Sequence, residues 1–176
     1  VMSRGGKVAT RFGFRSIFKY TCGKAQGLSF FIPNSGQPQL IAAVSGRIFA
    51  LPHPFDSYSE MTSIRFAEQA PMVFFKQATV SKTPTQVLTP YPVLLMQDGY
   101  SRAAYTDGQI SRHLDPTPDG FYSPVSVGAQ ETIVGLIMEW AGDRLWVARG
   151  RELFASDISD PLHFTENTYI GSGNSL

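Results

Sequence analysis

The chain has 176 residues, a formal net charge of +1, 16 glycines, 12 prolines and one cysteine, a length that suits one domain with a buried core. The single cysteine, Cys22, excludes an intrachain disulfide and a cysteine-based zinc site within one chain. The apolar runs are far shorter than the roughly 20 residues of a membrane helix, and no basic-plus-apolar leader follows Val1, so we predict no membrane or targeting segment.

Charge divides the chain into two unlike parts. Residues 1–55 contain seven basic residues and no acidic one, giving +7, whereas residues 56–176 contain 8 basic and 14 acidic residues, giving −6. A basic end can face nucleic acid, an acidic neighbouring subunit or water. We predict that residues 1–26 form a basic extended arm, in which the candidate docking or DNA contacts are Arg4, Lys7, Arg11, Arg15, Lys19 and Lys24.

The first strand signals lie between residues 27 and 51. Residues 28–32 are an apolar run, and the Pro-Asn-Ser-Gly segment at 33–36 predicts a turn. Two further β-capable runs, at 39–44 and 47–51, flank the dipeptide Ser45-Gly46. A two-residue connection with glycine in its second position predicts a β-hairpin.

Two later segments repeat this pattern. Residues 92–97 and 100–105 flank Asp98-Gly99, and Asp-Gly is the strongest short hairpin signal; Asp107-Gly108 predicts the next turn. Residues 136–141 and 144–148 flank Gly142-Asp143, where glycine comes first, as a type II′ turn prefers. Arg149-Gly150 then turns the chain into residues 152–155.

These hairpins predict an all-β fold. Gly46, Gly99 and Gly142 are about 53 and about 43 residues apart, a spacing within the broad range of propeller blades. We predict an antiparallel meander of short strands over residues 27–170, forming two to four blades of a partial or open β-propeller, followed by a flexible tail at 171–176. Residues 72–75 are continuously apolar and predict burial on both faces, whereas Ser57–Met61 is the single candidate for a helical turn.

Catalytic patterns are missing from the sequence. Ser172 lies in a polar terminal stretch without the strand-to-helix context of a nucleophile, and Lys7 lacks the rest of a phosphate loop. His53, His113 and His163 are too widely spaced to form a metal site on one element. We therefore predict a non-catalytic protein without cofactor or metal, in which Trp140 and Trp146 are core residues or, alternatively, a ligand platform.

Residues 136–169 resemble the propeller segments of bacteriophage virion proteins. The resemblance lies in four steps taken in order: Gly142–Val147, Ala155–Asp157, Asp160-Pro161 and Phe164. In such a segment Asp157 would accept backbone amides of the turn at 158–162, and Phe164 would fill the edge of a blade. The resemblance implies structural blade residues at Gly46, Asp98, Gly99, Gly142, Trp146, Asp157, Pro161 and Phe164.

The same resemblance implies a function and a location. Its family includes tail nozzle and packaged-DNA stabilisation proteins, which form rings beneath the portal and help to retain the genome. We therefore expect a fragment of a structural virion protein of a tail or head–tail connector, assembled in the host bacterial cytoplasm. Its expected partners are other tail or connector subunits in a homo-oligomeric ring, with passing contact to genomic DNA and none to a membrane.

An alternative function is a glycan- or receptor-binding propeller module of a phage tail. Its motivation is the number of aromatic side chains, because aromatic faces suit sugar rings. A propeller-based hydrolase is the weakest hypothesis, since it depends on carboxylates whose spacing shows no catalytic pair. The aromatic residues in question are Trp140, Trp146, Tyr100, Tyr105, Tyr122 and Tyr169.

Overall fold

The computed structural model describes residues 2–4, 7–9, 16, 19, 23–83, 86–114, 133–164 and 169–170. Every regular element within these ranges is a β-strand, so the predicted all-β class is confirmed. A short hairpin, β1 (Met2–Arg4) and β2 (Lys7–Ala9), lies at the N-terminal end, and its two strands pair with each other. The remaining twelve strands form three four-stranded sheets.

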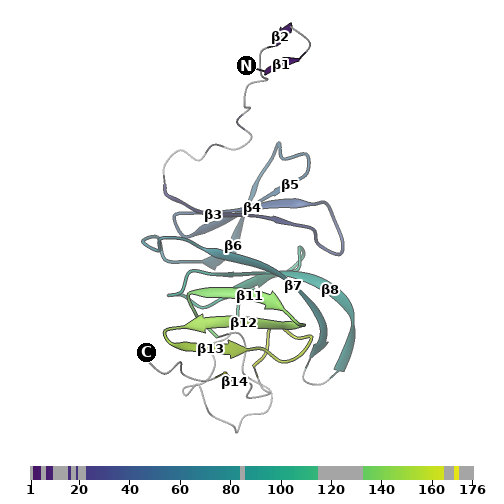
Figure 1. Ribbon diagram of the computed structural model, residues 1–176, viewed down its shortest axis with the longest axis vertical. Helices are drawn as coiled ribbons and strands as arrows, with labels where there is room; N and C mark the ends of the chain where they lie inside the picture. Colours follow the sequence, from purple (N-terminus) through teal and green to yellow (C-terminus); the bar gives the residue numbers. More distant parts are fainter. Residues whose placement is uncertain are drawn as a thin grey trace.

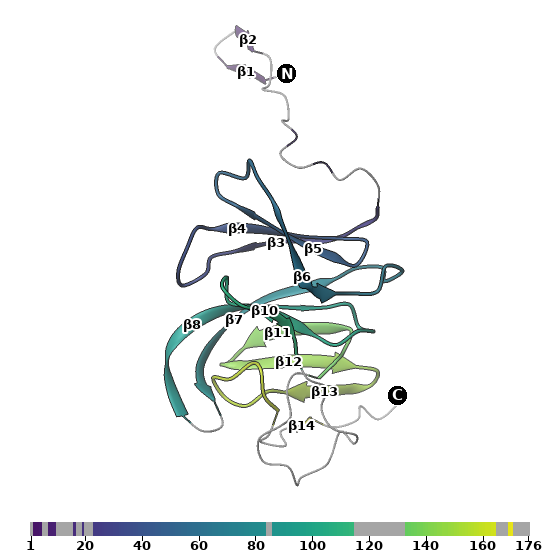
Figure 2. The same cartoon turned by 180° about the vertical axis from the view of Figure 1, so that it is seen from behind.

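Each large sheet is an antiparallel meander whose spatial order follows the chain (Figures 1 and 2). The first sheet contains β3 (Ala25–Phe31), β4 (Gln39–Val44), β5 (Arg47–Pro52) and β6 (Ser59–Arg65). The middle sheet contains β7 (Phe74–Thr83), β8 (Gln86–Gln97), β9 (Ala104–Thr106) and β10 (Ser111–His113). The third sheet contains β11 (Ile137–Ala141), β12 (Arg144–Arg149), β13 (Glu152–Ala155) and β14 (Tyr169–Ile170).

The middle sheet lies between the other two and packs against both (Figure 1). Successive side chains of a strand point to opposite faces, so β8 divides its apolar run between two cores. Val93 and Leu95 join the cluster shared with the third sheet, whereas Leu94 and Met96 join the cluster shared with the first. All four are fully buried, which explains why this strand is apolar without alternation.

Two of the predicted hairpins have the two-residue turns expected from sequence. At Ser45-Gly46 both residues have positive φ, 47° and 74°, which is the pattern of a type I′ turn. Gly142-Asp143 also has positive φ at both positions, 59° and 56°. The type II′ prediction there is therefore wrong, because aspartate, like asparagine, tolerates the left-handed region.

The hairpin predicted at Asp98-Gly99 has a longer connection. Strand β8 ends at Gln97 and β9 begins only at Ala104, so a six-residue loop joins them. Asp98 is the reason, because its carboxylate is engaged in hydrogen bonds that hold the start of this loop in place. The Asp107-Gly108 turn is likewise part of a four-residue loop between β9 and β10.

Two smaller predictions also need correction. The helical turn expected at Ser57–Met61 is wrong, because β6 begins at Ser59 and Glu60 pairs with Phe49 of β5. The apolar run at 72–75 is not uniformly buried, since Met72 is 46% exposed and lies before β7. From Phe74 onward the prediction holds, because Phe74 and Phe75 pack against the two different cores.

Within the described residues the three sheets form an open stack and none closes on itself. Three meanders fall within the predicted number of blades, but whether they are propeller blades stays a prediction. Strand β3 begins at Ala25, two residues before the predicted domain boundary, and the tail at 171–176 lies outside the described residues.

Candidate functional site

The predicted basic arm is described only in part. Arg4 and Lys7 are paired positions of the β1–β2 hairpin, whereas Arg11 and Arg15 lie outside the described residues. Lys19 is exposed. Lys24 has a role within the fold, since its ammonium group donates to the carbonyl of Ala70 at 3.1 Å. Within the described residues, these candidates therefore form no common site.

Three consecutive residues at the end of β8 join the three sheets. Gln97 Oε1 accepts the amide of Gly135, which leads into the third sheet, at 3.1 Å. Asp98 Oδ2 accepts the amide of Ala67, which follows the first sheet, at 2.8 Å. Gly99 has φ 81°, and a Cβ there would lie 2.9 Å from Leu136. The predicted blade residues Asp98 and Gly99 are thus junction residues.

The carboxylate of Asp98 accepts four hydrogen bonds. Its oxygens accept the amides of Tyr100 and Ser101 and the hydroxyl of Ser101 as well as the Ala67 amide. Burial alone would raise the pKa of Asp98, but these hydrogen bonds outweigh it and the net pKa is lowered. The side chain is 2% exposed, so the ionised carboxylate stabilises a buried junction.

The segment that carries the family resemblance forms a compact turn after β13. Asp157 is buried, but the turn carboxylate that accepts the Leu162 amide is that of Asp160, at 3.0 Å. Asp160 also contacts His163 Nδ1 at 2.7 Å. Pro161 is buried, and Phe164 belongs to the core between the middle and third sheets. The sequence placed Asp160-Pro161 at this turn but pointed to Asp157 as the carboxylate that accepts the turn amides.

The aromatic residues of the glycan hypothesis do not converge. Trp140 packs against the core beneath the third sheet, whereas Trp146 lies on the opposite face and donates its indole N–H to the Ala141 carbonyl. Tyr100 is 67% exposed on the β8–β9 loop, and Arg112 lies over the Tyr105 ring. Tyr122 and the side chain of Tyr169 lie outside the described residues.

The side chains of His113 and His163 form hydrogen bonds in the described part of the chain. His113 Nε2 accepts the Arg65 amide at 2.9 Å, and its Nδ1 contacts the Arg102 carbonyl, so the ring bridges the first and middle sheets. No group of three or more potential metal ligands occurs in the described part of the chain. The same residues contain no helix that could cross a membrane.

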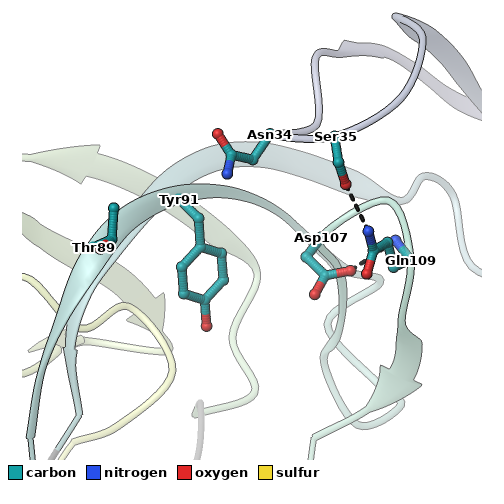
Figure 3. A pocket seen from close by; sticks show the side chains of 6 residues that line it. All are labelled: Asn34, Ser35, Thr89, Tyr91, Asp107 and Gln109. Carbon is teal, nitrogen blue, oxygen red and sulfur yellow. Dashed lines mark hydrogen bonds between the residues drawn. The ribbon is translucent and has the colours of Figure 1, made fainter.

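A polar hollow of about 300 Å³ lies where two loops meet strand β8 (Figure 3). The β3–β4 loop contributes Asn34 and Ser35, and the β9–β10 loop contributes Asp107 and Gln109. The ring of Tyr91 hangs from β8 between Thr89 and Asp107. Partial burial, and then the nearby Tyr105, Asp107 and Asp160, raise the pKa of Tyr91, so its hydroxyl stays protonated.

A second surface is the outer face of the first sheet, the face turned away from the middle sheet. Leu28, Phe30 and Ile32 are 63%, 50% and 52% exposed there. They lie beside a small apolar cluster on the same face, formed by Ala42, Val44, Phe49 and Leu51 with Leu40 and Phe55 packed against it. Leu28 pairs with Ala42 and Phe30 with Leu40, so the exposed side chains of β3 adjoin this cluster, in which Ala42, Val44, Phe49 and Leu51 are themselves buried.

No match was found to any model of a protein family, to any curated protein or to any solved structure.

Proposed function

We infer that this chain is a structural assembly protein that docks on a neighbouring subunit through the outer face of its first sheet. The observation that supports this proposal is the exposure of apolar side chains on that face, where Leu28, Phe30 and Ile32 are each at least half exposed. Exposed apolar side chains that form a contiguous patch, and do not stand singly, are typical of a protein–protein contact.

The rest of the fold suggests what covers this surface. Both faces of the middle sheet and the inner face of the first are covered by another sheet, and the outer face continues the same stack. The opposite end of the stack carries exposed apolar residues too, since Ile137 and Leu153 are 56% and 37% exposed on the outer face of the third sheet. We therefore assign the contact to the third sheet of a second copy.

Such a contact joins two different surfaces, so repeated copies form a ring if the rotation closes. The likeness of residues 136–169 to phage propeller segments supports placing this assembly in the virion, as a tail or head–tail connector protein. Three consecutive four-stranded meanders, packed face to face, are what successive blades of such a propeller require. In this proposal the basic arm contacts acidic subunits or passing DNA.

The docking face is tested by measuring the size of the assembly. Purified protein should associate in light scattering and sedimentation velocity, and the double variant Leu28→Ser/Phe30→Ser should remain monomeric. Val87→Ser is the matched control, because Val87 is 84% exposed but lies on the β7–β8 hairpin, away from this face. A wild-type protein that stays monomeric at high concentration, or a folded double variant that associates normally, contradicts the proposal.

The role of the arm is tested separately with labelled duplex DNA. Direct contact through its basic residues predicts binding that weakens steeply with added salt, because bound counterions are released. Fluorescence anisotropy of the duplex at increasing salt measures this. A flat salt response, or no binding, assigns the arm to protein–protein docking.

A further inference from the structure

The hollow between β8 and the two loops has a fixed shape. Gly108 lies in the β9–β10 loop with φ 96°, and a Cβ there would lie 2.4 Å from Cβ of Pro33 in the β3–β4 loop. Gln109 Nε2 donates to Ser35 Oγ at 2.7 Å across the same gap, between residues 74 positions apart in the chain. The two loops are thus tied together, and the groups they carry are held in place before any ligand binds.

The carboxylate of Asp107 is held with one oxygen occupied. Its Oδ1 accepts the amides of Gln109 at 2.8 Å and Ile110 at 2.7 Å. Its Oδ2 forms no hydrogen bond with another described residue, and the carboxylate lies beside the ring of Tyr91 in Figure 3. A carboxylate oriented by its own loop, with one oxygen available, is a strong acceptor for a ligand hydroxyl.

Other polar groups of the lining are also available to a ligand. Within the described part of the chain, the amide of Asn34 and the hydroxyls of Thr89 and Tyr91 have no hydrogen-bond partner. The Tyr91 hydroxyl can donate as well as accept. The site therefore offers donors and acceptors around the ring of Tyr91, which is half-buried and also packs against the core between the middle and third sheets.

We propose that this hollow binds one pyranose ring of a neutral glycan. A sugar ring has an apolar face that packs on an aromatic side chain, and adjacent hydroxyls that pair with carboxylate and amide groups. A volume of about 300 Å³ is at the small end of ligand sites and suits a single ring. Asn34, Ser35, Thr89 and Gln109 are exposed, so the rest of a glycan has a way out into solvent.

The charge of the site selects against other ligands. Among the described residues no lysine or arginine lines the hollow, whereas the carboxylate of Asp107 does. Phosphates, sialic acids and uronic acids would therefore meet repulsion. An apolar ligand would leave the polar groups of Asn34, Thr89, Tyr91 and Asp107 without partners, so it is disfavoured as well.

The test uses the whole chain and methyl glycosides, which imitate a sugar linked in a glycan. Methyl glycosides of glucose, galactose, mannose and N-acetylglucosamine are titrated while amide NMR signals are followed, with glucuronic and sialic acid glycosides alongside. At least one neutral probe should shift the side-chain amides of Asn34 and Gln109. Tyr91→Leu, which keeps an apolar side chain there, should weaken binding about ten-fold or more.

Two further variants keep the test decisive. Thr89→Val changes an exposed position and should weaken binding without affecting the fold, so it replaces Tyr91→Leu if that protein is unstable. Tyr100→Leu is the matched control, because Tyr100 is an exposed tyrosine on a different loop. The proposal is overturned if no neutral glycoside shifts these signals, if acidic glycosides bind equally well, or if Tyr100→Leu weakens binding as much as the Tyr91 and Thr89 variants.

Discussion

The first and middle sheets have the same size and strand order but differ in how many of their faces are covered. The middle sheet buries apolar side chains on both faces, as Leu94 and Leu95 show. The inner face of the first sheet is packed against the middle sheet, whereas on its outer face Leu28 and Phe30 remain at least half exposed beside a small buried cluster. The difference separates residues that stabilise the chain itself from residues that are available to a partner.

The largest expected effect is a difference in stability between two leucine truncations. Leu95→Ala removes a fully buried side chain from the core and should lower the free energy of unfolding by about 3–4 kcal/mol. Leu28→Ala, at 63% exposure, should change it by no more than about 0.5 kcal/mol in a monomeric sample. Urea unfolding followed by circular dichroism measures both, and a large loss for Leu28→Ala would mean that another part of the chain covers this face.

Two turn glycines, Gly46 and Gly142, also differ in how closely the rest of the chain packs against them. The Gly46 turn is packed under the end of β6, and a Cβ there would lie 2.3 Å from the Phe66 carbonyl oxygen. Gly142 has a similar positive φ but no atom within 4 Å of such a Cβ. We expect Gly46→Ala to cost about 3 kcal/mol and Gly142→Ala about 1 kcal/mol, the cost of the φ angle alone. Thermal and urea unfolding measure the loss of stability in each variant. Equal losses for the two variants would contradict this expectation.

A smaller loss of stability is expected from a substitution at Asp98, which links the middle sheet to the first. Asp98→Asn replaces one acceptor oxygen by a donor and should cost about 2 kcal/mol at neutral pH, because the Ala67 amide loses its acceptor. In the wild type the pKa of Asp98 is lowered on folding, so its contribution is fully present above the ordinary value of 3.8. That contribution is lost as pH falls through the lowered folded-state pKa.

The pH dependence distinguishes this charge effect from simple loss of packing. The difference in unfolding free energy between wild type and Asp98→Asn should shrink as pH is lowered below about 4, since the wild-type carboxylate becomes protonated. Urea unfolding at several pH values between neutral and acid measures it. A difference that stays constant over this range would contradict the proposed role of the ionised carboxylate.

Sequence was sufficient where the structure depends on neighbouring residues. The hairpins at Gly46 and Gly142 follow from local turn chemistry, and strand alternation is also a local property. The Asp98-Gly99 hairpin was placed wrongly because the carboxylate of Asp98 binds the Ala67 amide, 31 positions earlier. No local pattern shows that Asp98 serves another sheet.

The candidate hollow was missed for the same reason. Asn34 and Asp107 each looked like ordinary turn residues, and their loops are brought together by the packing of Gly108 on Pro33 and by the hydrogen bond from Gln109 to Ser35. Tyr91 gave no signal because it lies within a strand rich in apolar residues. The sequence did point to aromatic residues as sugar contacts, but the four whose side chains are described, Tyr100, Tyr105, Trp140 and Trp146, do not line this hollow.

Burial of β8 on both sides has a consequence for how the strand finds its position. A slip of one residue normally moves apolar side chains into water, but in β8 it would exchange one apolar set for another. Hydrophobicity therefore distinguishes poorly between the two alignments. The hydrogen bonds of Gln97 to Gly135 and of Asp98 to Ala67 do distinguish them, because a shifted strand would leave these buried polar groups without partners. Two polar side chains at the end of the strand thus select one alignment from those that the apolar core accepts.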